Sequence, residues 1–340
     1  MLKEMYSAGI IGVGAYIPEI IRKNDYWDGV DFVNLTKKNK NVFQGIEERR
    51  VFPEGVLPSD AEARAGMVAI EDSGLKPEDI DLVMVHSMIQ DELIPGNASL
   101  VQYKLGLKNA AAWNVDTCCS SFVTMVVNAA NLIATGEFKN ILIVTSVFHS
   151  WILDRSDYLA APIGDGAGAV LMSRVPDGKG YIASTFNSDG YYHDAFTLTE
   201  RLPYDVTKRK HCEPVPMRPY LTTNAAKTRE MGQNSVDDMC HLLSKVLEKA
   251  DIKSEDIDLF LSHQPCHWAH DAWREFVGIP KEKSYETFSK YGNMASSVIP
   301  INMYEAKRKG LLRDGYNVLI ASPGAGKNNS VAVLKWHDTK

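Results

Sequence analysis

The sequence predicts an α/β protein built from two similar halves with mixed, mostly parallel sheets. Short apolar runs typical of buried strands alternate with helix-like segments along the chain, which is typical of sheets covered by helices. The chain also repeats itself, because GLKPEDIDLVMVH, which ends at His86, resembles DIKSEDIDLFLSH, which ends at His263. We call the separation between these two histidines the repeat offset. A second pair of segments, NILIVTS from Asn140 and NVLIAS from Asn317, has the same offset. Two matches at one offset indicate an internal duplication.

The first half, residues 1–176, is expected to form one sheet with its covering helices. A glycine-punctuated apolar strand opens it, and SSFVTMVVNAANLIAT at 120–135 predicts a helix that is buried on nearly every face. Gly136 follows this helix and is a usual C-terminal signal. Strands are expected at 9–17, 81–86, 110–115, 140–146 and 168–173, and helices at 60–72, 99–105 and 120–135.

The second half, residues 177–340, repeats this order. Strands are expected at 181–186, 258–262, 284–288, 317–321 and 330–335, and helices at 236–250, 268–277 and 294–309. Residues 187–233 have no regular pattern of a helix or a strand and are rich in Tyr, Pro, Thr and charged residues. Irregular segments of that length are usually functional, so we expect this one to line a site. The sequence has no linker-like tract, and we expect one body.

Composition and charge exclude several classes of protein. At 340 residues, with 45% apolar and 24% charged residues, the chain is long enough for a large core. A formal charge of −6 and a pI near 5.9 argue against a surface that binds nucleic acid or anionic membranes. The sequence contains no apolar run of about 18 residues and no signal-peptide pattern. Five cysteines, two of them adjacent, do not make a disulfide framework, so we expect a cytoplasmic protein with reduced thiols.

Three residues are candidates for catalysis from their positions. Cys119 follows a predicted strand and opens the buried helix, where unpaired N–H groups and the helix dipole favour a thiolate and can hold an oxyanion. His263 directly follows a buried strand, at the edge where α/β sheets bind ligands, and Asn293 opens a predicted helix. Each also has a plain structural interpretation: Cys119 as a small buried hydrophobe, His263 as a hydrogen-bonded core residue, and Asn293 as a helix cap.

Other suggestive segments carry less weight. His263, Cys266, His267 and His270 are metal-type ligands, but four of them packed so closely along the chain would need an unusual loop, and we expect no metal. Three glycine-rich segments lack the full pattern of dinucleotide-binding or phosphate-binding loops, and we interpret them as tight backbone approaches. They are GVGAYIP at 12–18, GDGAGAV at 164–170 and GAGKNNS at 324–330.

These pieces, in this order, resemble the thiolase-fold condensing enzymes, most closely the β-ketoacyl-acyl-carrier-protein synthase III group. VDTCCSSF at 115–122 resembles the nucleophile segment of that family, with Cys119 in the reactive place. SHQP at 262–265 resembles its His-Gln segment, and GNMASSVIP at 292–300 resembles its Gly-Asn segment. GDGAGAV and SPGAG resemble its two glycine-rich turns, so the resemblance covers nearly the whole chain.

The resemblance implies a thiolase fold, in which two five-stranded sheets and their helices stack as five layers, α/β/α/β/α. It implies that a thioester, on an acyl carrier protein or on CoA, acylates Cys119, and that the acyl group then condenses with a malonyl- or β-ketoacyl-type thioester. Backbone N–H groups of Cys119 and Ala325 would hold the oxyanion, and His263 and Asn293 would donate to the enolate oxygen. The family needs no further cofactor. The expected partners are an acyl carrier protein and a second copy of the chain.

Some positions bear on the dimer and on the acyl donor. By the resemblance, Ile94 and Pro95 fall where the partner subunit reaches toward the pocket, and Phe122 is expected at the substrate tunnel or the dimer contact. The Trp and Arg with which the family's CoA-primed members hold CoA are missing from KKNKNVFQGIEERR, where Phe43 takes the place of the Arg. Delivery on a carrier protein is therefore at least as well supported as delivery on CoA.

Several alternatives stay open. Arg274, Lys281 and Lys283 could form a docking patch for an acidic carrier, or could simply be solvated. A thiolase-fold acyltransferase would pass the acyl group from Cys119 to an alcohol or amine without condensation, although Asn293 favours condensation. A degradative or biosynthetic thiolase would need a second cysteine in SPGAG, which has none. The departures from the family pattern favour a specialised member, such as one of secondary metabolism.

Overall fold

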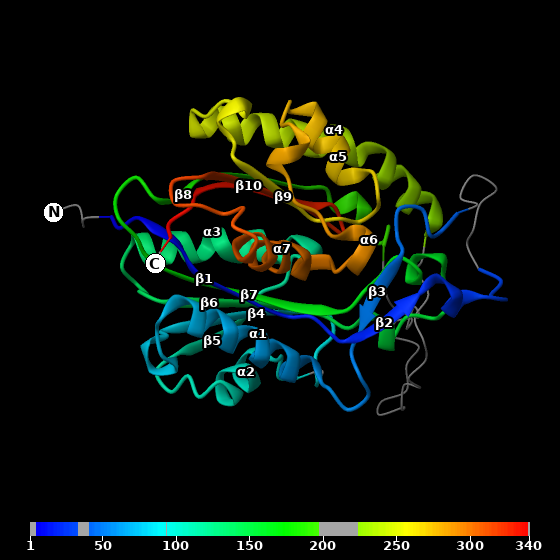
Figure 1. Cartoon of the computed structure of the whole chain (residues 1–340), viewed down its shortest axis with the longest axis horizontal. Helices are drawn as coiled ribbons and strands as arrows, with labels where there is room; N and C mark the ends of the chain where they lie inside the picture. The colour runs from blue at the N-terminus through cyan, green and yellow to red at the C-terminus, as the bar shows by residue number, and fades with distance from the viewer. Residues whose placement is uncertain (1–4, 33–40, 93, 197–223, 339–340) are drawn as a thin grey trace.

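The computed structural model describes residues 5–32, 41–92, 94–196 and 224–338, and the structural statements below concern these residues. They form five layers in the order α/β/α/β/α (Figure 1). One outer layer consists of α4 (Ala225–Ala250) and α5 (Ala269–Phe276), and the other of α1 (Pro58–Ser73) and α2 (Ala98–Lys104). Between the two sheets lie α3 and α7, as the predicted fold requires.

The first sheet has five strands in the order β1-β7-β6-β4-β5. Its strand β7 is antiparallel to β1 and β6, whereas β6, β4 and β5 are parallel, so most strands point the same way, as predicted. The strands are β1 (Ala8–Tyr16), β4 (Leu82–Ser87), β5 (Ala111–Asn114), β6 (Ile141–Val147) and β7 (Gly166–Arg174).

The second sheet has four strands in the order β8-β11-β10-β9, and its directions repeat those of β1, β7, β6 and β4. The strands are β8 (Gly180–Ser188), β9 (Leu259–Ser262), β10 (Asn317–Gly324) and β11 (Asn328–Lys335). The predicted strand at 284–288, and with it a five-stranded second sheet, is wrong. Ser284 makes only an isolated bridge to Phe260, and α6 (Phe288–Tyr291) follows. Side chains bind this segment instead, since the Thr287 N–H donates to Gln264 Oε1 over 3.1 Å.

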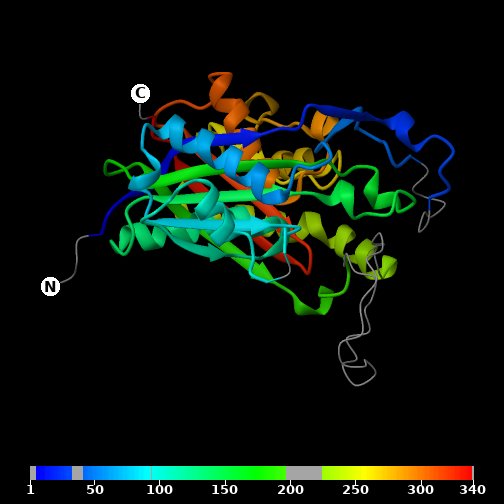
Figure 2. The ribbon, with the colours of Figure 1, turned by 90° about the horizontal axis from the view of Figure 1, so that it is seen from below.

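A second difference is the small sheet of β2 (Ile20–Lys23) and β3 (Glu48–Val51), which the sequence did not predict. The two strands lie side by side at one end of the body (Figures 1 and 2). Helix α4 begins at Ala225, well before the predicted start at 236. Residues 197–223, the greater part of the predicted site-lining loop, lie outside the described residues.

Helices α3 (Ser121–Ala134) and α7 (Val298–Arg308) are packed between the two sheets. Phe122, Met125 and Ile133 of α3 are fully buried there, which explains why its sequence is apolar on nearly every face. Burial of side chains of this size contributes about 1.5–3 kcal/mol each. Two further hydrophobic clusters fill the spaces between each sheet and its outer helices. The central layer is therefore a rigid support for the turns that precede α3 and α7.

The glycine-rich segments allow close backbone approaches, as predicted. A Cβ on Gly14 would collide with the backbone carbonyl of Ala65, so glycine lets α1 lie directly on β1. A Cβ on Gly324 would stand 2.8 Å from the carbonyl oxygen of Thr117, so glycine brings the end of β10 against the turn before α3. In the part of the chain that is described, no helix combines the length and apolar character needed to cross a membrane.

Candidate active site

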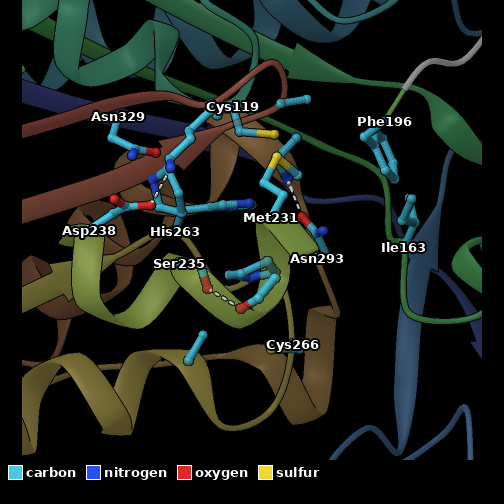
Figure 3. Close-up of a pocket in the computed structure, with 18 of the residues that line it drawn as sticks. Cys119, Ile163, Phe196, Met231, Ser235, Asp238, His263, Cys266, Asn293 and Asn329 are labelled. Carbon is cyan, nitrogen blue, oxygen red and sulfur yellow. Dashed lines mark hydrogen bonds and ion pairs between the residues drawn. The ribbon is translucent and has the colours of Figure 1, made fainter. Parts of the chain in front are cut away.

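A cavity of about 200 Å³ brings the predicted catalytic residues together. Cys119, His263 and Asn293 line it, although they are far apart in the sequence (Figure 3). Ala325 lines it as well. The cysteine comes from the turn before α3, the histidine from the end of β9, the asparagine from the loop after α6, and the alanine from the β10–β11 loop. The ends of strands from both halves therefore meet at one site.

The turn Cys118–Ser120 positions Cys119 just before α3. Cys118 has a left-handed backbone, with φ of 56°. Hydrogen bonds on both sides hold this conformation: the Cys118 N–H donates to Asp116 Oδ1 over 2.7 Å, and Ser121 Oγ donates to the Cys118 carbonyl over 2.7 Å. Ser322 Oγ donates to the Cys119 carbonyl over 2.8 Å and ties the turn to β10. The sulfur of Cys119 is thus presented from a fixed backbone.

The ionisation of Cys119 differs from the prediction made from its helix position. The sulfur atoms of Cys118 and Cys119 lie 3.9 Å apart. This neighbouring thiol, together with burial, raises the pKa of Cys119 well above its usual value. The backbone N–H groups of Ala325 and Cys119 act in the opposite direction, which means that both face the Cys119 sulfur. Free Cys119 is therefore a thiol at neutral pH, with two N–H donors beside it.

His263 is a buried, neutral imidazole. Its backbone N–H donates to the Ala321 carbonyl over 2.8 Å, which extends the pairing of β9 with β10. Burial lowers the pKa of His263 to about 3, and a hydrogen bond to the backbone of Ala295 opposes this only in part. A neutral imidazole in this cavity can donate one hydrogen bond and remains uncharged at physiological pH.

The side-chain amide of Asn293 has a defined orientation. Its backbone is held on both sides, because the Asn293 N–H donates to the Pro162 carbonyl over 2.7 Å and the Gly164 N–H donates to the Asn293 carbonyl over 3.2 Å. The Oδ1 atom accepts the Ala295 N–H over 2.8 Å. Among the described residues no hydrogen bond uses Nδ2, so this NH₂ group is left to donate to a bound molecule.

Sequence reasoning missed other residues of the cavity. His149 follows β6 as His263 follows β9, and this placement was the available signal. It is 3% exposed, neither ring nitrogen has a hydrogen-bond partner among the described residues, and burial lowers its pKa to about 4. Lys327 and Asp238, which form an ion pair of 2.9 Å, also line the cavity. That pair joins α4 to the β10–β11 loop, a contact that no local pattern encodes.

Other predicted positions lie elsewhere. Phe122 does not line the cavity; it is fully buried in the core between the sheets. Ile94 and Pro95 are exposed outside the cavity. Arg274 is not available for docking, because it is buried and pairs with Asp271 and Glu275, each over 3.0 Å. Its side chain points back onto α5 and its C-terminal turn.

Among the metal-type residues at 263–270, His270 serves packing and hydrogen bonding. His270 Nδ1 lies 2.8 Å from Ser262 Oγ, and its ring stacks on Phe260. Within the described ranges, no group of three or more His, Cys, Asp or Glu side chains could hold a metal ion.

A second cavity, of about 410 Å³, adjoins the first and shares Pro265, Cys266 and Trp268 with it. Its other walls come from residues 41–44, from Tyr158 to Pro162, and from Phe288. Trp268, one of the shared wall residues, is 41% exposed.

The fold and this site define a class of enzyme: a cysteine-dependent acyltransferase of the thiolase fold. Residues 114–190 match the family described as 3-Oxoacyl-[acyl-carrier-protein (ACP)] synthase III, and residues 247–336 match its C-terminal counterpart. Residues 52–146 match the thiolase N-terminal domain.

Known proteins agree with these matches. The chain is 34% identical over 331 residues to "Beta-ketoacyl-[acyl-carrier-protein] synthase III" of Listeria innocua, with 97% of this chain and 99% of that protein covered. The crystal structure of the synthase III from Thermus thermophilus is similar with a TM-score of 0.85, at 30% identity, and covers 97% of this chain and 100% of that one. A priming β-ketosynthase of the R1128 polyketide pathway shares the fold, with a TM-score of 0.87 at 21% identity over 100% of this chain and 99% of that one.

The chain therefore belongs to the 3-oxoacyl-[acyl-carrier-protein] synthase III family. It is an acyltransferase of the condensing type with the thiolase fold, as the sequence predicts.

Proposed function

We propose that the enzyme transfers an acyl group from a thioester to Cys119 and condenses it with a malonyl- or β-ketoacyl-type thioester. The observation that carries this proposal is the meeting of one thiol, one neutral imidazole and one oriented amide at a single cavity. The thiol can hold an acyl group, and the two nitrogen donors can stabilise an oxyanion.

In the first step the Cys119 sulfur attacks the acyl thioester. The negative charge on the thioester oxygen would be held by the backbone N–H groups of Cys119 and Ala325, which already face the sulfur. The carrier thiolate leaves and takes up the proton that the Cys119 thiol loses. The product is an acyl-enzyme without net charge at the sulfur.

In the second step the extender thioester loses CO₂, or a proton where it carries no carboxylate, and becomes an enolate. His263 and Asn293 Nδ2 would donate to the enolate oxygen, and the Asn293 amide is oriented before the charge develops. For His263 this requires the tautomer whose single N–H faces the cavity and not the Ala295 backbone. The enolate carbon attacks the acyl-Cys119 carbonyl, the new carbon–carbon bond forms, and Cys119 leaves as a thiolate that is then protonated.

The substrates would arrive as thioesters on a flexible arm that passes through the second cavity. A pantetheine arm on an acyl carrier protein would suit this route, because Cys119 lines the first cavity and the second cavity shares walls with it. The names of the relatives point to the same carrier. CoA is the alternative carrier of the acyl group.

We place the enzyme in the cytoplasm. The partly exposed cysteines near the site are free thiols, as is usual in that compartment.

The alternative, acyl transfer to an alcohol or amine without condensation, is not favoured. Such a reaction has no use for a second donor to an enolate, whereas Asn293 is held so that its NH₂ group stays available. Secondary metabolism, as opposed to the initiation of fatty-acid synthesis, remains our prediction from the sequence.

A homodimer is part of the proposal. Strand β5 is the outer strand of the first sheet and carries the exposed Trp113, while Ile94, in the connection between β4 and α2, is 85% exposed. An apolar edge of this kind is suited to pairing with a second copy. Light scattering of wild type and of Trp113→Glu tests the interface: we expect a dimer and a monomer, respectively.

We place the boundary of the duplicated halves between residues 176 and 177, in the connection from β7 to β8.

The decisive experiment separates the two steps. The protein is incubated with an acyl thioester, and the mass of the Cys119 peptide reports acylation, while product release after addition of malonyl-carrier reports condensation. We expect His263→Ala and Asn293→Ala to be acylated at nearly the wild-type rate. We expect their condensation to fall about 10²–10³-fold, the usual effect of removing one oxyanion donor.

His241→Ala is the matched control, because His241 is an exposed residue of α4 outside both cavities. It should lose neither step. Normal condensation in both site variants would refute the assigned roles, and the absence of acylation in the wild type with every thioester offered would refute the proposed function itself.

A further inference from the structure

The duplication relates a second set of polar residues to the catalytic ones. Each member of the set Cys119, His263 and Asn293 has a counterpart one repeat offset away in the other half. The counterparts are Ser296, His86 and Asp116, in the same order. Each set thus has a nucleophile-type residue, a histidine, and an acid or amide. In both sets one half of the chain supplies the nucleophile-type residue, and the other half supplies the remaining two.

The backbone repeats with the same offset. The turn Cys118–Ser120 precedes α3, and the turn Ala295–Ser297 precedes α7, so the starts of both the turns and the helices are separated by the repeat offset. The first residue of each turn is left-handed, with φ of 56° at Cys118 and 44° at Ala295. The two turns also pack against each other. The correspondence is therefore structural and does not rest on numbering alone.

The second set is connected by one hydrogen bond and one contact between a ring nitrogen and a carboxylate oxygen. His86 Nδ1 lies 2.8 Å from Ser296 Oγ, and His86 Nε2 lies 3.3 Å from Asp116 Oδ1. Since the Asp116 carboxylate only accepts, Nε2 carries the hydrogen that faces it. The contact with His86 is the largest cause that lowers the pKa of Asp116 to about 2, so the carboxylate is ionised.

The chain of contacts ends at the two catalytic turns. At one end, Asp116 Oδ1 also accepts the N–H of Cys118, the neighbour of Cys119. At the other end, Ser296 follows Ala295, whose N–H holds the amide of Asn293. His86 is the link between them, and it is only 2% exposed.

We propose that Ser296, His86 and Asp116 form a positioning network that fixes the Cys119 turn and the Asn293 turn relative to each other. The network rests on the proposed function, since it holds the groups that act in the two steps. It is not a second catalytic site: Ser296 is 1% exposed and lines neither of the two cavities beside Cys119. Such a network matters because small displacements of reacting groups lower rates strongly.

The test compares Ser296→Ala, Asp116→Asn and the double variant with Ser297→Ala. Ser297 is the matched control, because it lies in the same turn, is fully buried, and its hydroxyl has no hydrogen-bond partner among the described residues. We expect each single variant to lower kcat for condensation about 10-fold with KM within about 2-fold. The double variant should lose little more than either single one, because both break the same chain through His86. Ser297→Ala should stay within about 2-fold of the wild type.

Hydrogen exchange gives a readout that does not depend on the reaction. In Ser296→Ala the amide of Cys118 should exchange about 5-fold faster or more, although the substitution is in the other half, while the core amides of α3 should be unchanged. A general loss of stability would instead accelerate all of them. Three results would overturn the proposal. The first is a loss of kcat in the double variant equal to the product of the two single losses. The second is an unchanged exchange rate of the Cys118 amide in Ser296→Ala, and the third is labelling of Ser296 by a fluorophosphonate in the Cys119→Ala variant. A wild type that no thioester acylates would refute the proposed function and leave the exchange result to decide on the network.

Discussion

Replacing His149 by leucine should make the protein more resistant to acid. Burial holds the pKa of His149 at about 4 in the folded protein, against its ordinary value of 6.5. Between these two values the unfolded chain binds a proton that the folded protein does not bind. The stability of the wild type therefore falls as the pH is lowered from about 6.5 to about 4, and a leucine removes this contribution.

The expected magnitude follows from the two pKa values. At pH 5 the difference in proton binding at His149 destabilises the folded state by about 2 kcal/mol, and at pH 7.5 by almost nothing. Leucine also removes a buried imidazole without hydrogen-bond partners among the described residues, which adds about 1–3 kcal/mol of stability at every pH. His263 and His270, with pKa values lowered by burial to about 3 and about 4, keep the variant acid-sensitive.

Urea unfolding at pH 7.5, 6 and 5, followed by circular dichroism, measures the effect. The gain in the free energy of unfolding of His149→Leu over wild type should be larger by about 2 kcal/mol at pH 5 than at pH 7.5. His241→Leu, on the exposed face of α4, is the control for loss of an imidazole. A gain that is the same at both pH values would show that His149 is not held neutral by burial, and would refute the reasoning.

Three further variants test the fold and the positions of Phe122 and Arg274. Gly14→Ala should destabilise the protein by about 3 kcal/mol in urea, because its Cβ meets the backbone of α1, whereas Gly190→Ala, which has open space, should not. Phe122→Ala should lower the free energy of unfolding by about 3–5 kcal/mol without changing acyl-chain preference. A changed preference at unchanged stability would show that Phe122 lines the substrate tunnel. Arg274→Ala should lower stability by about 1–3 kcal/mol and leave carrier-protein affinity, measured by calorimetry, unaltered; a selective loss of affinity would contradict its buried, paired position.

The sequence predicts most of the fold because its patterns are local and repeated. The segment at 120–135, apolar on nearly every face, is buried between two sheets, and a helix in that layer needs apolar residues on most of its circumference. His263 could be placed at a site because residues that follow parallel strands share one sheet edge. The motifs around Cys119 and Asn293 then identified the two turns that meet His263 at this edge.

The rest depends on contacts between distant segments. Arg274 looks like a surface charge in sequence, but the chain folds back and the Ile279 carbonyl accepts its hydrogen bond over 2.8 Å. The segment at 284–288 was predicted as a strand, but it makes only one backbone hydrogen bond to β9, from the Tyr285 N–H to the Phe260 carbonyl, and the Gln264 side chain accepts the Thr287 N–H instead of a neighbouring strand. The role of His86 was equally hidden, because its partners Asp116 and Ser296 come from other segments, the second of them in the other half of the chain.

The two halves differ at the loops that follow the corresponding strands β6 and β10. The β10–β11 loop supplies Ala325, which lines the Cys119 cavity and offers its N–H to the sulfur. One repeat offset earlier in the chain, Ala325 corresponds to Phe148. Phe148 is fully buried and stacks on Phe52, with ring centroids 4.1 Å apart, in the cluster between the first sheet and its outer helices. The next residue, His149, lines the Cys119 cavity. At this loop position one half therefore has a small residue that opens onto the reactive cavity, whereas the other half has a large aromatic side chain that is packed into the core.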